Sequence, residues 1–394
     1  MKRLIAPTLA ALALAACSDI SQSPTASPSP EQLRAPEAPY FAKGGAGIAG
    51  DYIVVFTDDV VDALSKADEK ALKHGTSVKF KYDKALKGFA ATLSPGAVAQ
   101  LQADPDVAYI EQDQVVTTQT TQSGATWGID RIDQRSLPLS GTYTYTSTGT
   151  GVRAYIIDTG IQTSHPQFGG RASAVYDALG GNGQDCNGHG THVAGTVGSA
   201  TYGVAKNALL RAVRVLNCSG SGTSSQVLAG INWVATNHIK PAVANMSLGG
   251  GFSSAENSAV NSLASAGVFI AVAAGNSNAD ACNSSPSSAA NATTVASSTS
   301  SDAKSSFSNW GGCVDLYAPG SSITSLWLNG GTNTISGTSM ASPHVAGVAA
   351  LYKAAFGDAS YSTIRTWLTT NATANVITGN VSGTPNKLLY KSTL

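Results

Sequence analysis

The sequence predicts an α/β protein: a mostly parallel sheet flanked by helices on both faces, preceded by a small α+β domain. Three observations favour this fold class. Residues 51–111 read as strand, helix, two strands, helix and strand, which is the order of a ferredoxin-like unit. The strand-like run 152–157 then ends in Asp158, and open α/β sheets place functional residues at that edge. A buried strand at 268–273 and a helix at about 341–356 complete the pattern.

The elements of the small domain follow from local composition. Apolar runs and polar–apolar alternation predict strands at 52–56, 77–82, 88–93 and 107–111. Helix-forming residues fill 60–74, and a second helix is expected over 97–103. Ser94 suits the N-cap of that second helix because its hydroxyl can accept a free backbone N–H, and Pro95 suits the first helical position.

Composition indicates a compact exported protein rather than a disordered one. Of the 394 residues, 42% are hydrophobic and 12% are charged, about half the usual charged share, and 41 are glycine. The formal net charge is zero, because residues 1–119 carry 11 Lys/Arg against 14 Asp/Glu whereas 120–394 carry 13 against 10. Neither part has the basic surface that a nucleic-acid partner requires. The opposite signs are compatible with contact between the two parts.

The amino terminus predicts export. Two basic residues precede an apolar run ending at Ala16, the pattern of a signal peptide over residues 1–17 that is too short to span a membrane. The end of the run, Leu-Ala-Ala-Cys17, resembles the lipobox of bacterial lipoproteins, in which the cysteine is lipidated. A lipid there would anchor the precursor to a membrane; the alternative is ordinary secretory cleavage among the alanines. Residues 18–48 are rich in Ser, Pro and Gly and read as a flexible tether.

Three short segments each carry one reactive side chain among glycines and small residues. They are YIIDTGI around Asp158, NGHGTHVAGT around His189 and SGTSMASPHVAG around Ser339. A serine hydroxyl is a weak nucleophile that needs a base. His189, as neutral imidazole, can take the hydroxyl proton, while Asp158 fixes the tautomer and stabilises the imidazolium. The helix after Ser339 directs its dipole at developing negative charge, so the three segments predict an acyl-transfer site.

Two other histidines compete for the role of base. His192 lies three residues after His189, and His344 follows Ser339. The segment HGTH lacks the glutamate and the i,i+4 spacing of a zinc protease, which disfavours a metal pair. Packing and hydrogen bonding within helices are the expected roles of both, which leaves His189 as the base.

These segments, together with AAGN at 273–276, SLGG at 247–250 and SGSG at 219–222, resemble the subtilisin-like serine proteases (peptidase S8). The proteinase K and aqualysin-like group is the most similar. The resemblance implies a subtilisin-like three-layer fold for residues 120–394, no cofactor for the chemistry and a monomeric mature enzyme. GFAATL and VAYIEQD, within residues 49–119, resemble the I9-type inhibitor prodomains. In that family the prodomain templates folding of the enzyme and then lays its tail in the cleft.

The resemblance implies further site residues. Asn276 would donate its side-chain amide to an oxyanion, with the backbone N–H of Ser339 as second donor; a turn asparagine is the alternative. An extended peptide would be held by the two glycine-rich edges and the turn after 268–273, through Gly220, Ser221, Gly222, Ser247, Leu248, Gly249, Ala274 and Gly275. The family also implies broad endopeptidase activity with apolar or aromatic residues favoured before the cut.

Four cysteines follow Cys17, and four allow three connectivities. Export favours oxidation, and the resemblance implies the pairs Cys186–Cys218 and Cys282–Cys313; free buried thiols are the alternative. The resemblance also implies structural calcium, with hard oxygen ligands on loops. The ligands of one site would be Asp315 and the carbonyls of Ala290 and Ala292, and those of a second Asp130, Asp133, Gln134, Ser140 and Thr142. A capped helix start near Asp130 and a surface ion pair at Asp315 are the alternatives.

The sequence therefore predicts a secreted serine endopeptidase, extracellular when mature, that is made as an inactive precursor and cleaves itself near Thr120. Residues 112–119 would be the inhibitory tail, and no module is expected after the carboxyl-terminal residues. An esterase would need G-x-S-x-G and the order Ser, Asp, His, whereas this chain has Ala341 and the order Asp, His, Ser. A catalytically weak or dead binding protein would usually lack a triad member, and none is missing. An inhibitory role of the prodomain is the last alternative.

Overall fold

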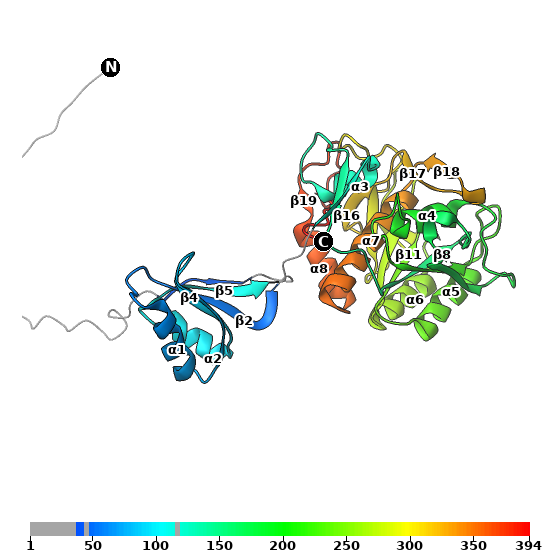
Figure 1. The fold of residues 1–394 in the computed structure, drawn as a ribbon. Helices are drawn as coiled ribbons and strands as arrows, with labels where there is room; N and C mark the ends of the chain where they lie inside the picture. The colour runs from blue at the N-terminus through cyan, green and yellow to red at the C-terminus, as the bar shows by residue number, and fades with distance from the viewer. Residues whose placement is uncertain (1–36, 43–46, 115–118) are drawn as a thin grey trace, which may run out of the picture. The chain divides into compact units, whose positions relative to one another are not determined.

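The computed structural model describes residues 37–42, 47–114 and 119–394, and it divides into two compact units, Met1–Val115 and Val116–Leu394 (Figure 1). The predicted signal peptide, Cys17 and most of the predicted tether lie outside the described residues. Within the described part, no helix is long and apolar enough to cross a membrane.

The small unit packs two helices against a five-stranded sheet of order β1-β5-β2-β4-β3. Its elements are β1 (Tyr40–Phe41), β2 (Gly47–Phe56), α1 (Ala63–Lys73), β3 (Val78–Tyr82), β4 (Gly88–Thr92), α2 (Pro95–Gln102) and β5 (Val107–Gln114). The predicted order of elements is confirmed, and Ser94 caps α2 by accepting the N–H of Ala97 at 3.2 Å. The short strand β1, parallel to β5, is an addition that the sequence did not predict.

The large unit is built on a nine-stranded sheet of order β19-β20-β16-β15-β13-β11-β8-β10-β9. Every pairing in it is parallel except that between β19 and β20. The strands of this sheet are β8 (Arg153–Asp158), β9 (Ala172–Asp177), β10 (Leu209–Arg214), β11 (Ala242–Met246), β13 (Phe269–Ala273), β15 (Thr293–Ser298), β16 (Leu316–Pro319), β19 (Thr373–Ala374) and β20 (Lys387–Leu388).

The described residues of this unit form six helices: α3 (Trp127–Asp133), α4 (His189–Gly198), α5 (Ser224–Asn237), α6 (Ser254–Ser265), α7 (Thr338–Phe356) and α8 (Tyr361–Asn371). Three short 3₁₀ turns lie at Pro166–Phe168, Ala281–Asn283 and Leu328–Gly330. Three two-stranded ribbons complete the unit: β6 (Thr120–Ser123) with β7 (Thr142–Tyr145), β12 (Gly250–Gly251) with β14 (Ser284–Ser285), and β17 (Ile323–Leu326) with β18 (Thr332–Ile335).

Helices cover both faces of the large sheet, as predicted. Helices α4 and α7 pack against each other, as do α5 and α6, and Figure 1 shows α4 and the α5–α6 pair on opposite faces. The central strands are therefore buried on both sides: every residue of β11 (AVANM) and β13 (FIAVA) is buried. Parallel strands of this kind read as continuous apolar runs because neither face meets water.

The same parallel arrangement places several polar residues at one edge. Asp158 ends β8, Ser247 directly follows β11, and the turn 274–276 directly follows β13. Because these three strands are neighbours and run in the same direction, their carboxyl ends lie side by side. This is the edge at which open α/β sheets carry their functional sites.

Two features differ from, or add to, the sequence-based expectation. Helix α7 begins at Thr338 rather than near residue 341, so Ser339 lies within its first turn. The four cysteines form Cys186–Cys218 and Cys282–Cys313, with Cα–Cα distances of 4.9 and 5.3 Å. This is the pairing that the resemblance implied.

Candidate active site

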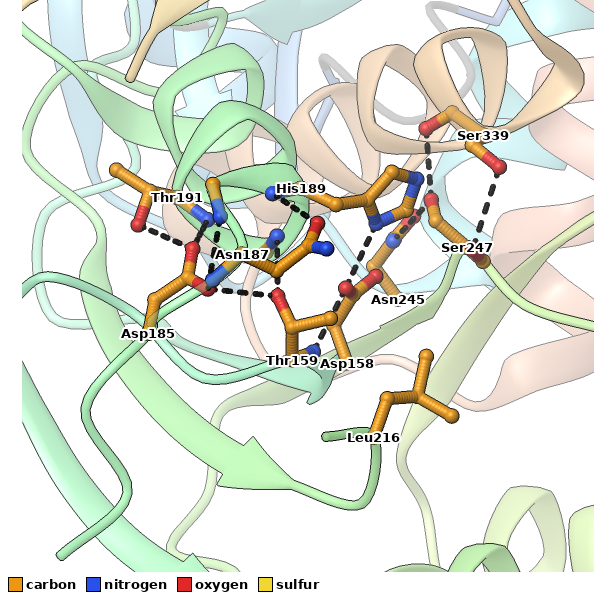
Figure 2. Close-up of polar contacts among 12 residues, drawn as sticks. Asp158, Thr159, Asp185, Asn187, His189, Thr191, Leu216, Asn245, Ser247 and Ser339 are labelled. Carbon is orange, nitrogen blue, oxygen red and sulfur yellow. Dashed lines mark hydrogen bonds and ion pairs between the residues drawn. The ribbon is translucent and has the colours of Figure 1, made fainter. Parts of the chain in front are cut away.

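Asp158 and His189 form a directly hydrogen-bonded pair. Asp158 ends β8 and His189 begins α4, and Nδ1 of His189 lies 2.7 Å from Oδ1 of Asp158 (Figure 2). The Asp158 side chain is fully buried, whereas the His189 side chain is 25% exposed. Burial lowers the pKa of His189, but the charge and hydrogen bond of Asp158, with a smaller contribution from Asp185, outweigh it and raise that pKa above its ordinary value of 6.5.

Ser339 is held at the same place through Ser247. The Ser339 hydroxyl donates to the carbonyl of Ser247 at 3.2 Å, and the Ser247 hydroxyl donates to the carbonyl of Ser339 at 2.7 Å (Figure 2). Ser247 and His189 line the same pocket. The structure thus brings the three predicted residues together, with the Ser339 hydroxyl directed at a carbonyl rather than at the imidazole. Free enzymes often show long catalytic hydrogen bonds that tighten when substrate binds.

A buried series of side-chain hydrogen bonds holds the backbone at Ser339 in place. The amide of Asn245, on β11, donates to the Ser247 hydroxyl at 2.9 Å and accepts from the Ser342 hydroxyl at 2.7 Å. Asn245 and Ser342 are almost completely buried. Each donor in this series has an acceptor, so the series fixes the start of α7 relative to β11 at little energetic cost.

Asn276 is oriented by the residue before Ser339. Its Oδ1 accepts both the backbone N–H of Thr338 at 2.8 Å and the Thr338 hydroxyl at 2.9 Å. The oxygen of the amide is therefore engaged, and its NH₂ group is left to donate elsewhere. Asn276 and Ser339 line the same pocket, and the N–H of Ser339 belongs to the first turn of α7, where backbone donors have no helical partner. The geometry offers two donors beside one hydroxyl.

Two adjoining pockets make up the cleft, and together they contain all the predicted substrate-binding residues. The serine-side pocket, about 390 Å³, is lined by Ser339, Asn276, Ala274 and Gly275. The histidine-side pocket, about 490 Å³, is lined by His189, Ser247 and the segment 219–223. The segment 248–251 lines both pockets and so separates them.

Asp185 is a buried carboxylate that the sequence analysis missed. It is 8% exposed, and its Oδ1 accepts from the Thr159 hydroxyl at 2.9 Å and from the N–H groups of Asn187 and Gly188 at 2.9 and 3.0 Å. Its Oδ2 accepts from the N–H and hydroxyl of Thr191 at 2.9 and 2.6 Å (Figure 2). These contacts fix the first turn of α4 around His189. The available signal was an aspartate three residues before Gly188, the N-cap of α4, where its carboxylate can reach the free N–H groups of the first turn.

The two competing histidines have structural roles. His192 is completely buried, and its Nε2 lies 3.0 and 3.2 Å from the carbonyls of Ile323 and Asn333 on the β17–β18 ribbon. His344 places Nδ1 2.8 Å from the carbonyl of Met340 in its own helix. Burial lowers the pKa of each to about 4, so both are neutral at ordinary pH.

Four of the five residues of the second predicted calcium site are joined by hydrogen bonds, with the fifth, Asp133, beside them. Asp130 accepts from the backbone N–H and hydroxyl of Ser140 at 3.2 and 2.9 Å, and Gln134 Oε1 accepts from the same N–H at 3.1 Å. The hydroxyls of Ser140 and Thr142 lie 2.7 Å apart. Burial raises the pKa of Asp133 to about 6, and the Asp130 charge adds to this. Two carboxylates with neutral oxygen donors are the donor set that calcium prefers, so these residues fit the ion.

At the first predicted calcium site, the cation beside the carboxylate is an arginine. Asp315 is 8% exposed. Its Oδ1 accepts from Nε of Arg365 at 2.8 Å and lies 2.6 Å from Nη2 of the same guanidinium. The guanidinium also donates to the carbonyl of Ala290 at 3.4 Å. The structure therefore unites two of the three predicted ligands, Asp315 and Ala290, around Arg365. A calcium ion could bind there only if the guanidinium moved away.

Both units have close counterparts among known proteins. Residues 149–388 match the subtilase family (peptidase S8), and residues 51–119 match the peptidase inhibitor I9 family. An extracellular serine proteinase of Thermus sp. (strain Rt41A) is 50% identical over 97% of this chain and 97% of its own. A cuticle-degrading protease of Metarhizium anisopliae is 45% identical over 93% of this chain and 96% of its own. The crystal structure of a cold adapted subtilisin-like serine proteinase matches with a TM-score of 0.67 and 56% identity, over 68% of this chain and 99% of that one.

Proposed function

The chain belongs to the subtilase family, and we propose that it is an exported serine endopeptidase made as a self-processing precursor. The observation that carries this proposal is the 2.7 Å contact between Asp158 and His189 in the cleft where Ser247 holds Ser339. Such a constellation is specific to acyl transfer, because a nucleophile, a base and an orienting carboxylate must all converge.

The proposed reaction proceeds through an acyl-enzyme. His189 Nε2 takes the proton of the Ser339 hydroxyl as Oγ bonds to the peptide carbonyl carbon, while Nδ1–H donates to Asp158. The NH₂ of Asn276 and the N–H of Ser339 donate to the resulting oxyanion. As the C–N bond breaks, the imidazolium returns its proton to the leaving amine. Water then repeats the sequence and releases the acid.

The pockets support an extended peptide substrate. The edges around the cleft are largely glycine and serine, so backbone groups are accessible for pairing with a substrate strand. The serine-side pocket contains no charged side chain among the described residues, which suits an apolar or aromatic residue before the scissile bond. Broad specificity follows because the backbone, common to all peptides, makes most of these contacts.

The I9-type domain would control when the enzyme becomes active. We propose that residues 49–119 assist folding, that their carboxyl tail inhibits the cleft, and that cleavage near Thr120 releases the mature enzyme from 120–394. Residues 1–17 would direct export. Lipidation of Cys17 and a monomeric mature enzyme stay predictions that rest on the sequence.

The chemistry needs no cofactor, and we propose calcium as a structural ion. The oxygen donors around Asp130 and Asp133 support a site at the α3–β7 junction, where the charge of Lys391 already acts on Asp133 and the ion would add a second positive charge. Calcium at Asp315 is the weaker proposal, because Arg365 already supplies a positive charge there.

Wild type and Ser339→Ala, expressed side by side, test the function. Amino-terminal sequencing and casein hydrolysis should show a wild type that is cut near Thr120 and active, and a variant that stays full length and inactive. Equal processing of both would contradict self-maturation. An inert but folded wild type that still retains peptides would instead identify a binding protein.

A further inference from the structure

Glu256 is a buried carboxylate in the wall of the cleft, and the proposed mechanism gives it no role. It lies in the first turn of α6, where its N–H donates to the capping hydroxyl of Ser253 at 3.3 Å, and it is 5% exposed. Its Oε1 is buried without a hydrogen-bond partner, and no cation pairs with the carboxylate anywhere in the described part of the chain. A buried polar atom without a partner is costly and therefore calls for an explanation.

The Glu256 side chain nevertheless forms part of a pocket wall whose neighbouring members are apolar. Glu256 lines the histidine-side pocket together with Leu216, Val227 and Leu248. Of the described residues lining that pocket, Glu256 and His189 alone carry titratable side chains, and Asp158 and Asp185 lie behind the histidine. Burial raises the pKa of Glu256, while its place at the amino terminus of α6 favours the anion. The described lining of the pocket thus carries a carboxylate and no lysine or arginine.

The two pockets fix which substrate residue reaches Glu256. With the scissile carbonyl at Ser339 and Asn276, as the proposed function requires, the residue before the scissile bond would enter the serine-side pocket. Side chains of an extended peptide alternate in direction, so the second and fourth residues before the bond face the histidine-side pocket. The second lies beside His189 on α4, which must reach the scissile bond. Glu256 and Val227 come from α6 and α5, which lie on the opposite face of the sheet from α4 (Figure 1), so we assign them to the end of the pocket away from His189.

We propose that Glu256 makes this end of the cleft a subsite for a cationic side chain, lysine or arginine, at the fourth residue before the scissile bond. This inference rests on the proposed function. Leu216, Val227 and Leu248 would cover the methylene stem, as apolar surfaces do for long basic residues, and the carboxylate would accept from the charged head group. Oε1 itself is closed off from solvent, so the head group would meet the carboxylate through its other oxygen or after a rotation of the side chain that turns Oε1 toward the pocket.

Peptides that differ in one group test this inference. Internally quenched peptides would share one sequence with a favoured aromatic residue before the cut, and would carry lysine, norleucine or glutamate at the fourth position. Lysine and norleucine have the same stem, so their kcat/KM ratio isolates the ammonium. We expect lysine to exceed norleucine by about tenfold or more, the usual size of a charge-assisted hydrogen bond, and glutamate to be the poorest. Mass spectrometry confirms that the same bond is cut.

Three variants connect the preference to the residue. Glu256→Gln should bring the lysine-to-norleucine ratio close to one, and Glu256→Leu should reverse it. Asp358→Asn is the matched control: it removes one negative charge from an ion pair with Lys353, outside both pockets, and should leave the ratio unchanged. Because a ratio compares two substrates on one enzyme, partial unfolding of a variant does not alter it.

A tripeptide substrate that ends before the fourth position separates the two proposals. All variants should hydrolyse it at the wild-type rate within about twofold. Failure of every enzyme to hydrolyse it overturns the proposed function. Hydrolysis of the tripeptide combined with a wild-type ratio near one, or with a ratio that Glu256→Gln leaves unchanged, overturns the cationic subsite alone. A lysine preference at the second position instead overturns the assigned register.

Discussion

Asp185→Asn should separate the positioning of His189 from its chemistry. Asp185 touches neither Ser339 nor the imidazole, yet its carboxylate accepts the backbone N–H groups that shape the start of α4. The amide of asparagine is nearly isosteric with the carboxylate, so the change removes a charge and one acceptor without opening a cavity. We therefore treat Asp185 as a positioning residue.

The expected loss of stability follows from the contacts on Oδ2. In the variant an NH₂ group takes the place of that oxygen and faces the N–H of Thr191, which loses its acceptor. Hydrogen bonds to charged groups contribute about 1.5–3 kcal/mol each, and an unsatisfied buried donor costs about 1–3 kcal/mol. We expect the free energy of unfolding to fall by about 2–4 kcal/mol. The melting temperature should then drop by roughly 4–12 °C for a domain of this size.

The pH profile supplies a second, independent signature. Catalysis needs neutral His189, so kcat/KM falls as pH falls through the His189 pKa, which Asp158 and Asp185 hold above 6.5. Removing the Asp185 charge weakens the preference for imidazolium and lowers that pKa. The acidic limb should therefore move to lower pH, while the plateau falls because α4 is less well fixed.

Asp177→Asn is the matched control for this experiment. Asp177 is also largely buried, accepts the N–H groups of Leu179 and Gly183 and pairs with Arg214, but it does not contact the first turn of α4. It should lower the melting temperature without moving the acidic limb. Calorimetry and kcat/KM from pH 5 to 9 measure both quantities. An Asp185→Asn enzyme with the wild-type limb and a melting temperature within about 2 °C would refute the reasoning.

Three further perturbations test other parts of the molecule. Asn276→Leu should lower kcat by about 10²–10³-fold with little change in KM. This magnitude is the one known for the equivalent donor in subtilisin. An unchanged kcat in steady-state assays would exclude Asn276 from the oxyanion site. Asp302→Asn should lower the free energy of unfolding, measured in denaturant, by about 3–5 kcal/mol, because fully buried Arg131 loses its bidentate partner. A decrease below about 1 kcal/mol would contradict this. Chelation should lower the melting temperature of the wild type more than that of Asp130→Asn, which lacks one proposed ligand, and a wild type indifferent to chelators would argue against calcium.

Local sequence was sufficient for much of the secondary structure and for the identity of the reacting groups. Apolar runs over 268–273 and 152–157 predicted β13 and β8 to within a residue, because strands buried on both faces leave a continuous apolar signal. Ser94 and Pro95 predicted the start of α2 for an equally local reason. The start of α7 was predicted three residues late, because Ser339 and its neighbours are small residues with weak helical preference.

The sequence by itself determined which groups can react: an aspartate, a histidine and a serine, each among small residues that allow close approach. Only the tertiary structure decided what surrounds them. The link from Asp185 to Thr159, the arginine beside Asp315 and the place of Glu256 in the wall of the cleft all depend on residues far apart in the chain. A glutamate in the first turn of a helix is ordinary by local rules, since it favours the helix dipole. It becomes a candidate specificity determinant because parallel strands and their crossovers bring α6 to the edge where Ser339 lies. The periodicity of the sequence carries no information about how close α6 and Ser339 come.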